Sequence, residues 1–420
     1  MHDLLFLAHR LPYPPNKGDK IRSFNILQHL AQMYHVHLGA FVDDPDDWRH
    51  VAAMREICSE SCIAQLNSTT AKWRSLEGLI TREALTLPYY RDAKLQAWVD
   101  SLLGQGKVKR VWVSCSAMAQ YVTKHLGSNV RSIMDFIDVD SAKWRQYSDR
   151  KTWPISWLYR REHTYVLRYE QWVASKFSAS IFVSRAEAEL FKTLAPESTN
   201  RITYINNGVD TNYFSPARRY SNPYPIHDKV LVFTGAMDYW PNVDAVCWFA
   251  TEVFSAVHKH LPAARFYITG ARPVQAVRNL ARQPGVRVTG RVPDVRPYLA
   301  HACAAVAPLR IAQGVQNKVL EAMAMAKPVI ATRQAMAGID LCPALEHLVA
   351  DGPADLMERA IEQLNATQSF VLGKAVRQWV LDHYNWDENL RWLEKLLEGD
   401  SNPLATNDNS ENLVSETRRI

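Results

Sequence analysis

Short runs of aliphatic residues alternate along almost the whole chain with longer segments of helical period, and this alternation limits the fold more than any other feature. Strand and helix in strict alternation are typical of a parallel sheet covered by helices on both faces. One proline-rich stretch without apolar periodicity, residues 215–229, divides the series and has the composition of a linker. We therefore predict an α/β protein with two doubly wound domains.

The predicted strands are short, and several of those in the second series end at a glycine. The first series comprises residues 4–8, 36–41, 111–114, 132–136, 180–184 and 203–206, and the second comprises residues 230–234, 265–269, 286–289, 304–307 and 328–332. Open parallel sheets bind ligands at the carboxyl ends of their strands. Gly235, Gly270 and Gly290 therefore mark an edge where we expect a ligand.

The composition excludes several classes of protein. A net charge of +6, from 49 basic and 43 acidic residues, is too small for a typical nucleic-acid-binding protein, so we expect no nucleic-acid partner. No apolar run reaches the ~20 residues that span a bilayer, and the six cysteines form no CxxC pair. We expect a cytoplasmic protein with reduced thiols and no zinc or disulfide scaffold.

The densest functional signal is PLRIAQGVQNKVLEAMAMAKPVIAT, residues 308–332. A loop with Gly314 precedes a predicted helix over residues 315–325, and the free N–H groups and dipole of a helix start form an anion site. Lys318 can neutralise phosphate oxygens there, while Glu321, three residues later, suits sugar hydroxyls. We expect a diphosphate; the alternative is an ordinary amphipathic helix with both charges in solvent.

This segment resembles the donor-binding stretch of the GT-B glycosyltransferases, specifically family 4 of the retaining, nucleotide-sugar-dependent enzymes. In that family two glutamates separated by seven residues precede Ala-Met-Ala and Pro-Val-Ile-Ala, and LEAMAMAKPVIAT matches the second half. The resemblance implies that Glu321 binds the donor ribose, with Gly314, Asn317 and Lys318 beside it at the donor site. Gln313 stands where the family has its first glutamate, which contacts the transferred sugar, so the identity of that sugar stays open.

The resemblance extends to the opening of the second domain. FTGAMDYWPNVDAVCWF, residues 233–249, matches the family's glycine turn at Gly235. Many members carry an Arg and a Lys after this glycine to hold the diphosphate, whereas this loop offers aromatic residues, Asp238 and Asn242. Lys318 is then the main candidate cation for the diphosphate.

Two further segments agree with the same family. INNGVDTNYFSP, residues 205–216, resembles the end of its first domain. VTGRVPDVRPYL resembles its base-binding turn, which implies that Gly290, Arg291 and Val292 lie near the nucleobase.

The first half carries the expected acceptor site. LPYPPNKGDKIRSFNILQHLA, residues 11–31, resembles the family's first loop and helix, in which Gly18 lets the backbone approach the donor phosphate and the acceptor. The expected acceptor-binding residues are His9, Lys17, Asp19 and Arg22. Together with MDFIDVDSAKWRQYS and NKVLEAMAMAKPVIAT, this opening resembles a subgroup found beside exosortase-type sorting systems and exopolysaccharide assembly.

Asp138-Val139-Asp140 also spells the DxD motif with which GT-A glycosyltransferases hold a metal ion. A GT-A enzyme has one nucleotide-binding domain and would leave the second series of strands unexplained, so we expect no metal. At the end of the 132–136 strand, Asp135 or Asp138 is expected to orient the acceptor hydroxyl as part of the catalytic site with Lys318 and Glu321. The competing interpretation is that Asp140 or Ser141 caps the next helix.

Together these features imply a GT-B fold of two Rossmann-like domains with a cleft between them. The expected boundaries are an acceptor domain over 1–214, a linker over 215–229, a donor domain over 230–384, a helix over 385–398 that crosses back to the first domain, and a disordered tail over 399–420. The expected activity is metal-independent transfer of a sugar, with retention, from a nucleotide diphosphate sugar to a lipid-linked or polysaccharide acceptor. The alternatives are a nucleotide-sugar epimerase of the same fold and a catalytically silent sugar- or lipid-binding scaffold.

Residues 141–176 combine four tryptophans with a basic excess, eight basic against three acidic residues from residue 143 on. This mixture suits the headgroup layer of an anionic membrane, which Arg160, Arg161 and Arg168 would attract. We expect peripheral binding at the inner face of the cytoplasmic membrane. The competing interpretation is a helix over 155–174 that buries its tryptophans in the core.

Overall fold

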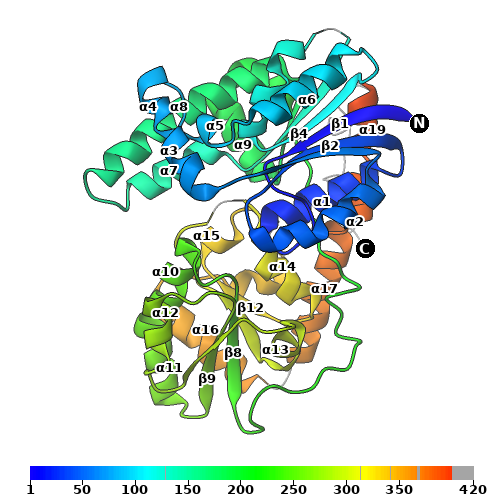
Figure 1. The fold of residues 1–420 in the computed structure, drawn as a ribbon. Coiled ribbons are helices and arrows are strands. Elements are labelled where there is room, and N and C mark those ends of the chain that lie inside the picture. The colour runs from blue at the N-terminus through cyan, green and yellow to red at the C-terminus, as the bar shows by residue number, and fades with distance from the viewer. Residues whose placement is uncertain (128, 313, 341, 367–368, 400–420) are drawn as a thin grey trace. The chain divides into compact units, whose positions relative to one another are not determined.

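The computed structural model describes residues 1–127, 129–312, 314–340, 342–366 and 369–399. The chain forms two compact units (Figure 1). Unit 1 comprises Met1–Asn206 together with residues 389–399, and unit 2 comprises Asn207–Glu388.

Within its described residues, unit 1 holds a seven-stranded parallel sheet in the order β3-β2-β1-β4-β5-β6-β7. The strands are β1 (His2–Ala8), β2 (Tyr34–Val42), β3 (Glu60–Gln65), β4 (Arg110–Ser114), β5 (Arg131–Ile137), β6 (Ala179–Phe182) and β7 (Ile202–Tyr204). The central strands read as unbroken apolar runs because helices cover both faces of the sheet.

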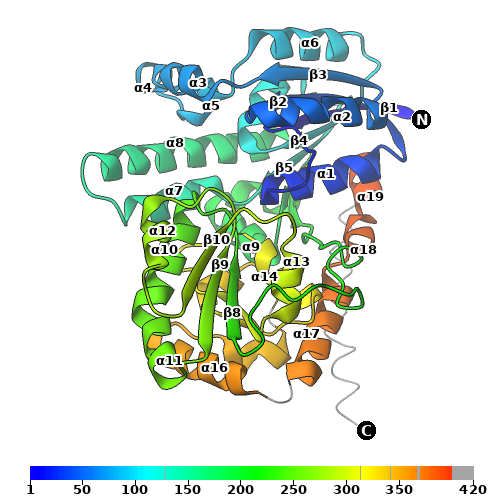
Figure 2. The same ribbon diagram turned by 60° about the horizontal axis from the view of Figure 1, so that its bottom comes forward.

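The helices of unit 1 lie on both faces, with α6 on one face and α1 on the other (Figure 2). They are α1 (Gly18–Leu30), α2 (Val51–Ile57), α3 (Ser68–Ser75), α4 (Glu77–Thr81), α5 (Thr86–Tyr89), α6 (Ala93–Gly104), α7 (Asp140–Ser148), α8 (Ile155–Lys176), α9 (Arg185–Leu194) and α19 (Leu393–Glu398). Short 3-10 turns cover Pro45–His50, Ser116–Tyr121, Thr123–His125 and Pro196–Arg201.

The described part of unit 2 holds a five-stranded parallel sheet in the order β10-β9-β8-β11-β12. Its strands are β8 (Lys229–Thr234), β9 (Ala264–Thr269), β10 (Val286–Gly290), β11 (Ala304–Ala307) and β12 (Val329–Ala331). Its helices are α10 (Trp240–Trp248), a π-helical turn (Phe249–Phe254), α11 (Ser255–His260), α12 (Gln275–Leu280), α13 (Arg296–His301), α14 (Asn317–Ala324), α15 (Arg333–Met336), α16 (Pro353–Asn365) and α17 (Ser369–His383), with a 3-10 turn at Pro343–Leu348.

The structure confirms every predicted strand to within about two residues. It adds β3, an edge strand that was not predicted because its side chains are half-buried or exposed and do not form an apolar run.

Residues 215–229, which we predicted to be a linker, lie inside unit 2 instead. Tyr224 is buried in the core of that unit, its hydroxyl donates to the backbone oxygen of Tyr298, and its ring lies 4.6 Å from that of Tyr267. The segment lacks periodicity because it is irregular in structure and is held by aromatic side chains, Tyr224 in the core and Tyr220 packed against it.

The predicted single helix over 385–398 is two short helices, α18 (Trp386–Leu390) and α19. Arg131 of β5 donates to the backbone oxygen of Leu396, and Arg110 of β4 pairs with Glu398, so α19 packs against the sheet of unit 1. The tail predicted to be disordered lies, from residue 400 on, outside the described residues. No described helix is long and apolar enough to cross a membrane.

Candidate functional site

The carboxyl edge of the unit 2 sheet begins with two glycine turns in backbone contact. Gly235 follows β8 and donates its N–H to Thr269, the last residue of β9. A Cβ on Gly270 would lie 1.7 Å from the carbonyl oxygen of Gly235, so only glycine fits at that position. A Cβ on Gly235 would lie 2.8 Å from Nδ2 of Asn242. The turn after β8 is thus packed tightly against α10.

Asn242 connects this turn to Lys318, the cation expected from the sequence. The Asn242 side chain is buried, donates to the carbonyl oxygen of Ala236, and accepts from Nζ of Lys318 at 2.5 Å. The ammonium also lies 4.7 Å from the centre of the Phe233 ring. These contacts hold Lys318 in place at the first turn of α14, beside the glycine turn.

Lys318 and Glu321 lie one turn apart on α14 and are both poorly solvated. Burial lowers the pKa of Lys318 to about 8, although Glu321 opposes the shift. Burial raises the pKa of Glu321 to about 7, and Lys318 again opposes the shift. The carboxylate of Glu321 accepts no hydrogen bond from any described residue. Two poorly solvated charges lower the stability of the fold when no ligand is bound. They are also well placed to bind a ligand.

The N-terminus of α14 has no side-chain cap, since its N-cap residue, Gln316, makes no capping hydrogen bond. Asn317 accepts a bond from Asn207 at 3.4 Å. Gly314 has a φ of 63°, and a Cβ on Gly338 would lie 2.3 Å from the Gly314 oxygen, so the loop before α14 packs against the chain at Gly338. Gln313 lies outside the described residues.

Near Glu321, the side chain of Arg296 stacks on the ring of Tyr213. The Arg296 guanidinium lies 3.7 Å from the centre of the Tyr213 ring and makes a bidentate ion pair with Asp294. Glu321 is close enough to Tyr213 to contribute, after burial and Asp294, to a raised pKa of its hydroxyl.

The turn expected to bind the base is open. Gly290 has a φ of 70° and nothing within 4 Å of an added Cβ. Arg291 beside it is exposed and makes no hydrogen bond or ion pair with a described residue, while Val292 is half-buried. Both side chains can therefore reach a ligand at this edge.

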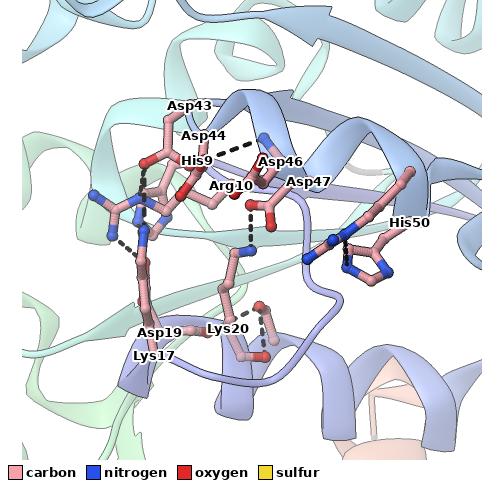
Figure 3. A network of polar contacts seen from close by, with 12 residues as sticks. His9, Arg10, Lys17, Asp19, Lys20, Asp43, Asp44, Asp46, Asp47 and His50 are labelled. Atoms are coloured by element: carbon pink, nitrogen blue, oxygen red, sulfur yellow. Dashed lines mark hydrogen bonds and ion pairs between the residues drawn. The ribbon is translucent and has the colours of Figure 1, made fainter. Parts of the chain in front are cut away.

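A second polar cluster lies at the carboxyl edge of the unit 1 sheet, around the start of α1 (Figure 3). His9 and Arg10 follow β1, and both contact the same oxygen of Asp19, at 2.9 and 2.7 Å. Arg10 also bonds Asp43 at 2.9 Å, and Lys17 approaches Asp43 at 3.8 Å. The structure thus gathers the expected residues His9, Lys17 and Asp19 and adds Arg10 and Asp43.

The charges in this cluster are strongly coupled. Burial acts to raise the pKa of Asp19, but bonds from His9 and Arg10 hold it well below its usual range. Burial acts to lower the pKa of His9, but Cys115 and Asp19 raise it to about 10. His9 is therefore an imidazolium at neutral pH, able to donate hydrogen bonds but not to accept a proton.

Gly18 is the first residue of α1, and its N-cap, Lys17, makes no side-chain cap. The N-terminal N–H groups of α1 therefore have no side-chain partner at the cap position, at the same edge as His9 and Asp19. This placement agrees with the expected approach of a ligand to Gly18.

Two expected site residues are structural instead. Arg22 and Asp135 are fully buried and form a bidentate ion pair, and Arg22 also donates to the backbone oxygen of Ile205. Neither side chain can touch an acceptor, so the expectation for both is corrected: the pair ties α1 to β5. Lys20 is likewise buried, against Asp47 at 2.6 Å.

Asp138 follows β5, after Ile137 with a φ of 71°. Burial, and after it the nearby Glu187, raise the pKa of Asp138 to about 7. The carboxyl is therefore partly protonated at neutral pH, which suits a hydrogen bond to an acceptor hydroxyl.

The competing interpretation, that Asp140 or Ser141 caps the next helix, is wrong. The N-cap of α7 is Val139, with no side-chain cap, so neither Asp140 nor Ser141 caps the helix. Among the described residues, no group of three or more His, Cys, Asp or Glu side chains is arranged so that it could bind a metal ion.

Comparison with known proteins finds a family model that matches part of the chain. Residues 228–366 match the family described as glycosyl transferases group 1. The matched residues lie within unit 2 and make up about a third of the chain. No protein of curated function matches the sequence.

Solved structures are similar to nearly the whole chain. HepE from Anabaena, in complex with UDP and glucose, aligns at a TM-score of 0.63 and 13% identity over 95% of this chain and 100% of that one. A glycosyltransferase from Rickettsia africae gives 0.63 and 14% over 94% and 98%. WaaG, a glycosyltransferase involved in lipopolysaccharide biosynthesis, gives 0.62 and 15% over 93% and 99%. At such identities the likeness shows the fold, and the predicted two-domain, Rossmann-like GT-B fold is confirmed.

From the sequence, Asn242 was only a substitute for the family's cations, and its contact with Lys318 was not predicted. Arg10 and Asp43 were not predicted either. Arg10 directly follows His9 at the end of β1, and Asp43 directly follows β2, so the carboxyl-edge rule that singled out His9 would have found both.

Proposed function

We propose that the protein is a glycosyltransferase whose unit 2 binds a nucleotide diphosphate sugar. The observation that carries this proposal is the start of α14, where Lys318 is held beside an uncapped helix N-terminus and Glu321 lacks a hydrogen-bond partner among the described residues. Helix N–H groups and an ammonium suit a diphosphate, and a carboxylate suits the two ribose hydroxyls.

Sugar transfer needs stabilisation of the leaving diphosphate, because negative charge grows on it as the sugar becomes oxocarbenium-like. Lys318 and the N–H groups of α14 act where this charge develops. We propose retention of anomeric configuration by front-face substitution, in which the leaving phosphate helps to deprotonate the acceptor. In this scheme no side chain of the protein bonds to the sugar, and no metal ion is needed for the leaving group.

The acceptor role falls to unit 1. His9, cationic beside Asp19, donates a hydrogen bond to an acceptor oxygen, and Asp138, partly protonated at neutral pH, orients a hydroxyl. We propose a saccharide or lipid-linked acceptor, in exopolysaccharide assembly beside an exosortase-type system and at the cytoplasmic face of the membrane. The description of WaaG as an enzyme of lipopolysaccharide biosynthesis supports an acceptor of this class.

Nucleotide binding and donor turnover test the proposal together. UDP is the first nucleotide to try, because HepE binds UDP, and we expect it to raise the melting temperature of the full chain. Glu321→Ala should weaken donor binding by about 2 kcal/mol, the scale of a charged hydrogen bond. Lys318→Ala should lower kcat more than it raises KM, because it acts on developing charge. Lys259→Ala and Glu252→Ala, which change exposed residues of the same unit, are the matched controls.

The outcomes separate the alternatives. Consumption of donor without any acceptor, with an epimerised sugar as product, would indicate an epimerase. Binding without slow donor hydrolysis would indicate a silent scaffold. Unchanged donor affinity in folded Glu321→Ala would remove Glu321 from the site.

A further inference from the structure

Helices α3 and α4 in unit 1 present their large apolar residues to solvent. Trp73 is 72% exposed, Ile80 is 86% exposed, and Leu76 and Leu79 are also exposed. The inward positions of the same helices are held by Ala71 and Gly78. An ordinary surface helix buries its apolar stripe, so this pair has the reverse arrangement.

A second group of exposed apolar residues lies at the start of α8. Trp153 is 80% exposed, and Ile155 and Trp157 are each about half exposed. This contradicts the competing interpretation that the helix buries its tryptophans: its inward face instead carries Ser156, Glu162, Val166, Glu170, Val173 and Ala174.

The two groups are tied together by α8. Arg161 donates to the backbone oxygens of Gly78 and Glu83, and Glu162 accepts from the backbone N–H groups of Leu85 and Thr86. Trp157 lies one turn before Arg161 on the helix. Both views of the ribbon place α4 beside the first half of α8 (Figures 1 and 2). We name the exposed apolar residues Trp73, Leu76, Leu79, Ile80, Trp153, Ile155 and Trp157 the apolar tip.

The charge around the apolar tip is positive. Lys72, Arg82 and Arg160 are exposed and make no ion pair with a described residue. Arg150 and Lys151 are also exposed, against the exposed acids Glu77 and Asp149.

Burial removes the other acids of this segment from the surface. Glu162 and Glu170 are buried and accept backbone N–H bonds, so the outward charge is more basic than the sequence count indicates.

We propose that the apolar tip is the surface with which this protein contacts an anionic lipid bilayer. Tryptophans sit well in the headgroup layer, and the surrounding cations are attracted to anionic lipids. A second copy of the chain fits less well, because a symmetric contact would bring two basic surfaces together. The inference rests on the surface of unit 1 and is independent of the sugar-transfer proposal.

This assignment corrects the role expected for one arginine. Arg161 holds α4 through backbone oxygens, so it is a structural residue and not a lipid ligand. Variants that test lipid binding should therefore leave Arg161 unchanged.

The test is co-sedimentation of the full chain with vesicles of phosphatidylcholine, alone or mixed with phosphatidylglycerol. We expect binding to the anionic vesicles only, weakened by salt. Trp73→Ser with Ile80→Ser should lower the partition coefficient on the order of tenfold. Changing Lys72, Arg82 and Arg160 to Gln should lower it about fivefold for each charge.

Matched controls change equally exposed residues elsewhere. Ile226→Ser is the apolar control, and Lys107, Lys259 and Arg282 to Gln are the charge control; both should bind vesicles normally. Nucleotide-dependent melting should stay unchanged in every variant, which keeps this test separate from that of the proposed activity.

Equal binding to neutral and anionic vesicles, or no binding to either, would overturn the proposal. So would undiminished binding of the Trp73 and Ile80 variant. Self-association of the lipid-free protein that this variant abolishes would instead assign the surface to a second copy.

Discussion

The pair of charged groups on α14 should cost the protein stability, and a charge-free variant should recover it. Lys318→Met with Glu321→Gln keeps similar shapes but removes both charges. The pKa of Lys318 falls from 10.5 to about 8, which corresponds to about 3 kcal/mol. That of Glu321 rises from 4.5 to about 7, a similar amount. Losing the Asn242 bond costs about 1–3 kcal/mol, so we expect a net gain of about 3–5 kcal/mol at neutral pH.

The pH dependence identifies the cause. A raised carboxyl pKa means that the folded state holds the proton more tightly, so the unsubstituted protein loses stability as pH rises from 4.5 to about 7. A lowered lysine pKa means that the unfolded state holds it more tightly, so stability returns as pH rises from about 8 to 10.5. The double variant lacks both titrating groups, so its stability has neither of these two pH dependences. Its advantage should therefore be largest between pH 7 and 8 and shrink on both sides.

Chemical and thermal denaturation of the full chain across this pH range measure the advantage. For a unit of this size each kcal/mol moves the melting temperature by about 2–4 °C. Donor binding should be lost in the same variant, because both side chains would contact the donor. A stability difference that does not vary with pH, or a less stable variant near pH 7.5, would refute the reasoning that both groups are desolvated.

Three further predictions concern the turns, the core and the metal. Gly270→Ala should destabilise unit 2 by more than about 3 kcal/mol because its Cβ meets the Gly235 oxygen, whereas Gly290→Ala, with open space, should cost only about 1 kcal/mol; similar losses in denaturation would contradict this. Arg22→Met should lower stability by about 3–5 kcal/mol by leaving Asp135 unpaired, with nucleotide binding by calorimetry unchanged. Donor turnover should survive EDTA; loss with rescue by manganese would revive a metal role for the Asp138 motif.

The strands were predictable because each central one is an apolar run long enough to be recognised. Leu4, Phe6 and Leu7 of β1 are fully buried, and so are Val111 and Val113 of β4. β3 escaped because an edge strand buries less, and its side chains show no apolar run.

The grouping of Lys318 and Glu321 was also predictable, because they are three positions apart on one helix, α14; their role in donor binding stays a prediction. The errors concern charges whose partners are distant in sequence. Arg22 lies beside the expected ligand loop, and nothing near it in the chain reveals that Asp135 neutralises it. Tyr224 anchors the supposed linker through Tyr267 and Tyr298, which are equally remote.

The three glycine turns of unit 2 are joined by backbone bonds: Gly235 N–H to Thr269 and Gly270 N–H to Gly290, with Gly270 pressed against Gly235. None of these contacts involves a side chain, so truncating neighbouring side chains cannot uncouple them; only a Cβ added at a glycine, as in Gly270→Ala, would disturb them. Displacement of one turn by a ligand must move the others. We therefore expect binding at the two ends of a nucleotide to be non-additive, with a base analogue altering the rate at which the diphosphate is released.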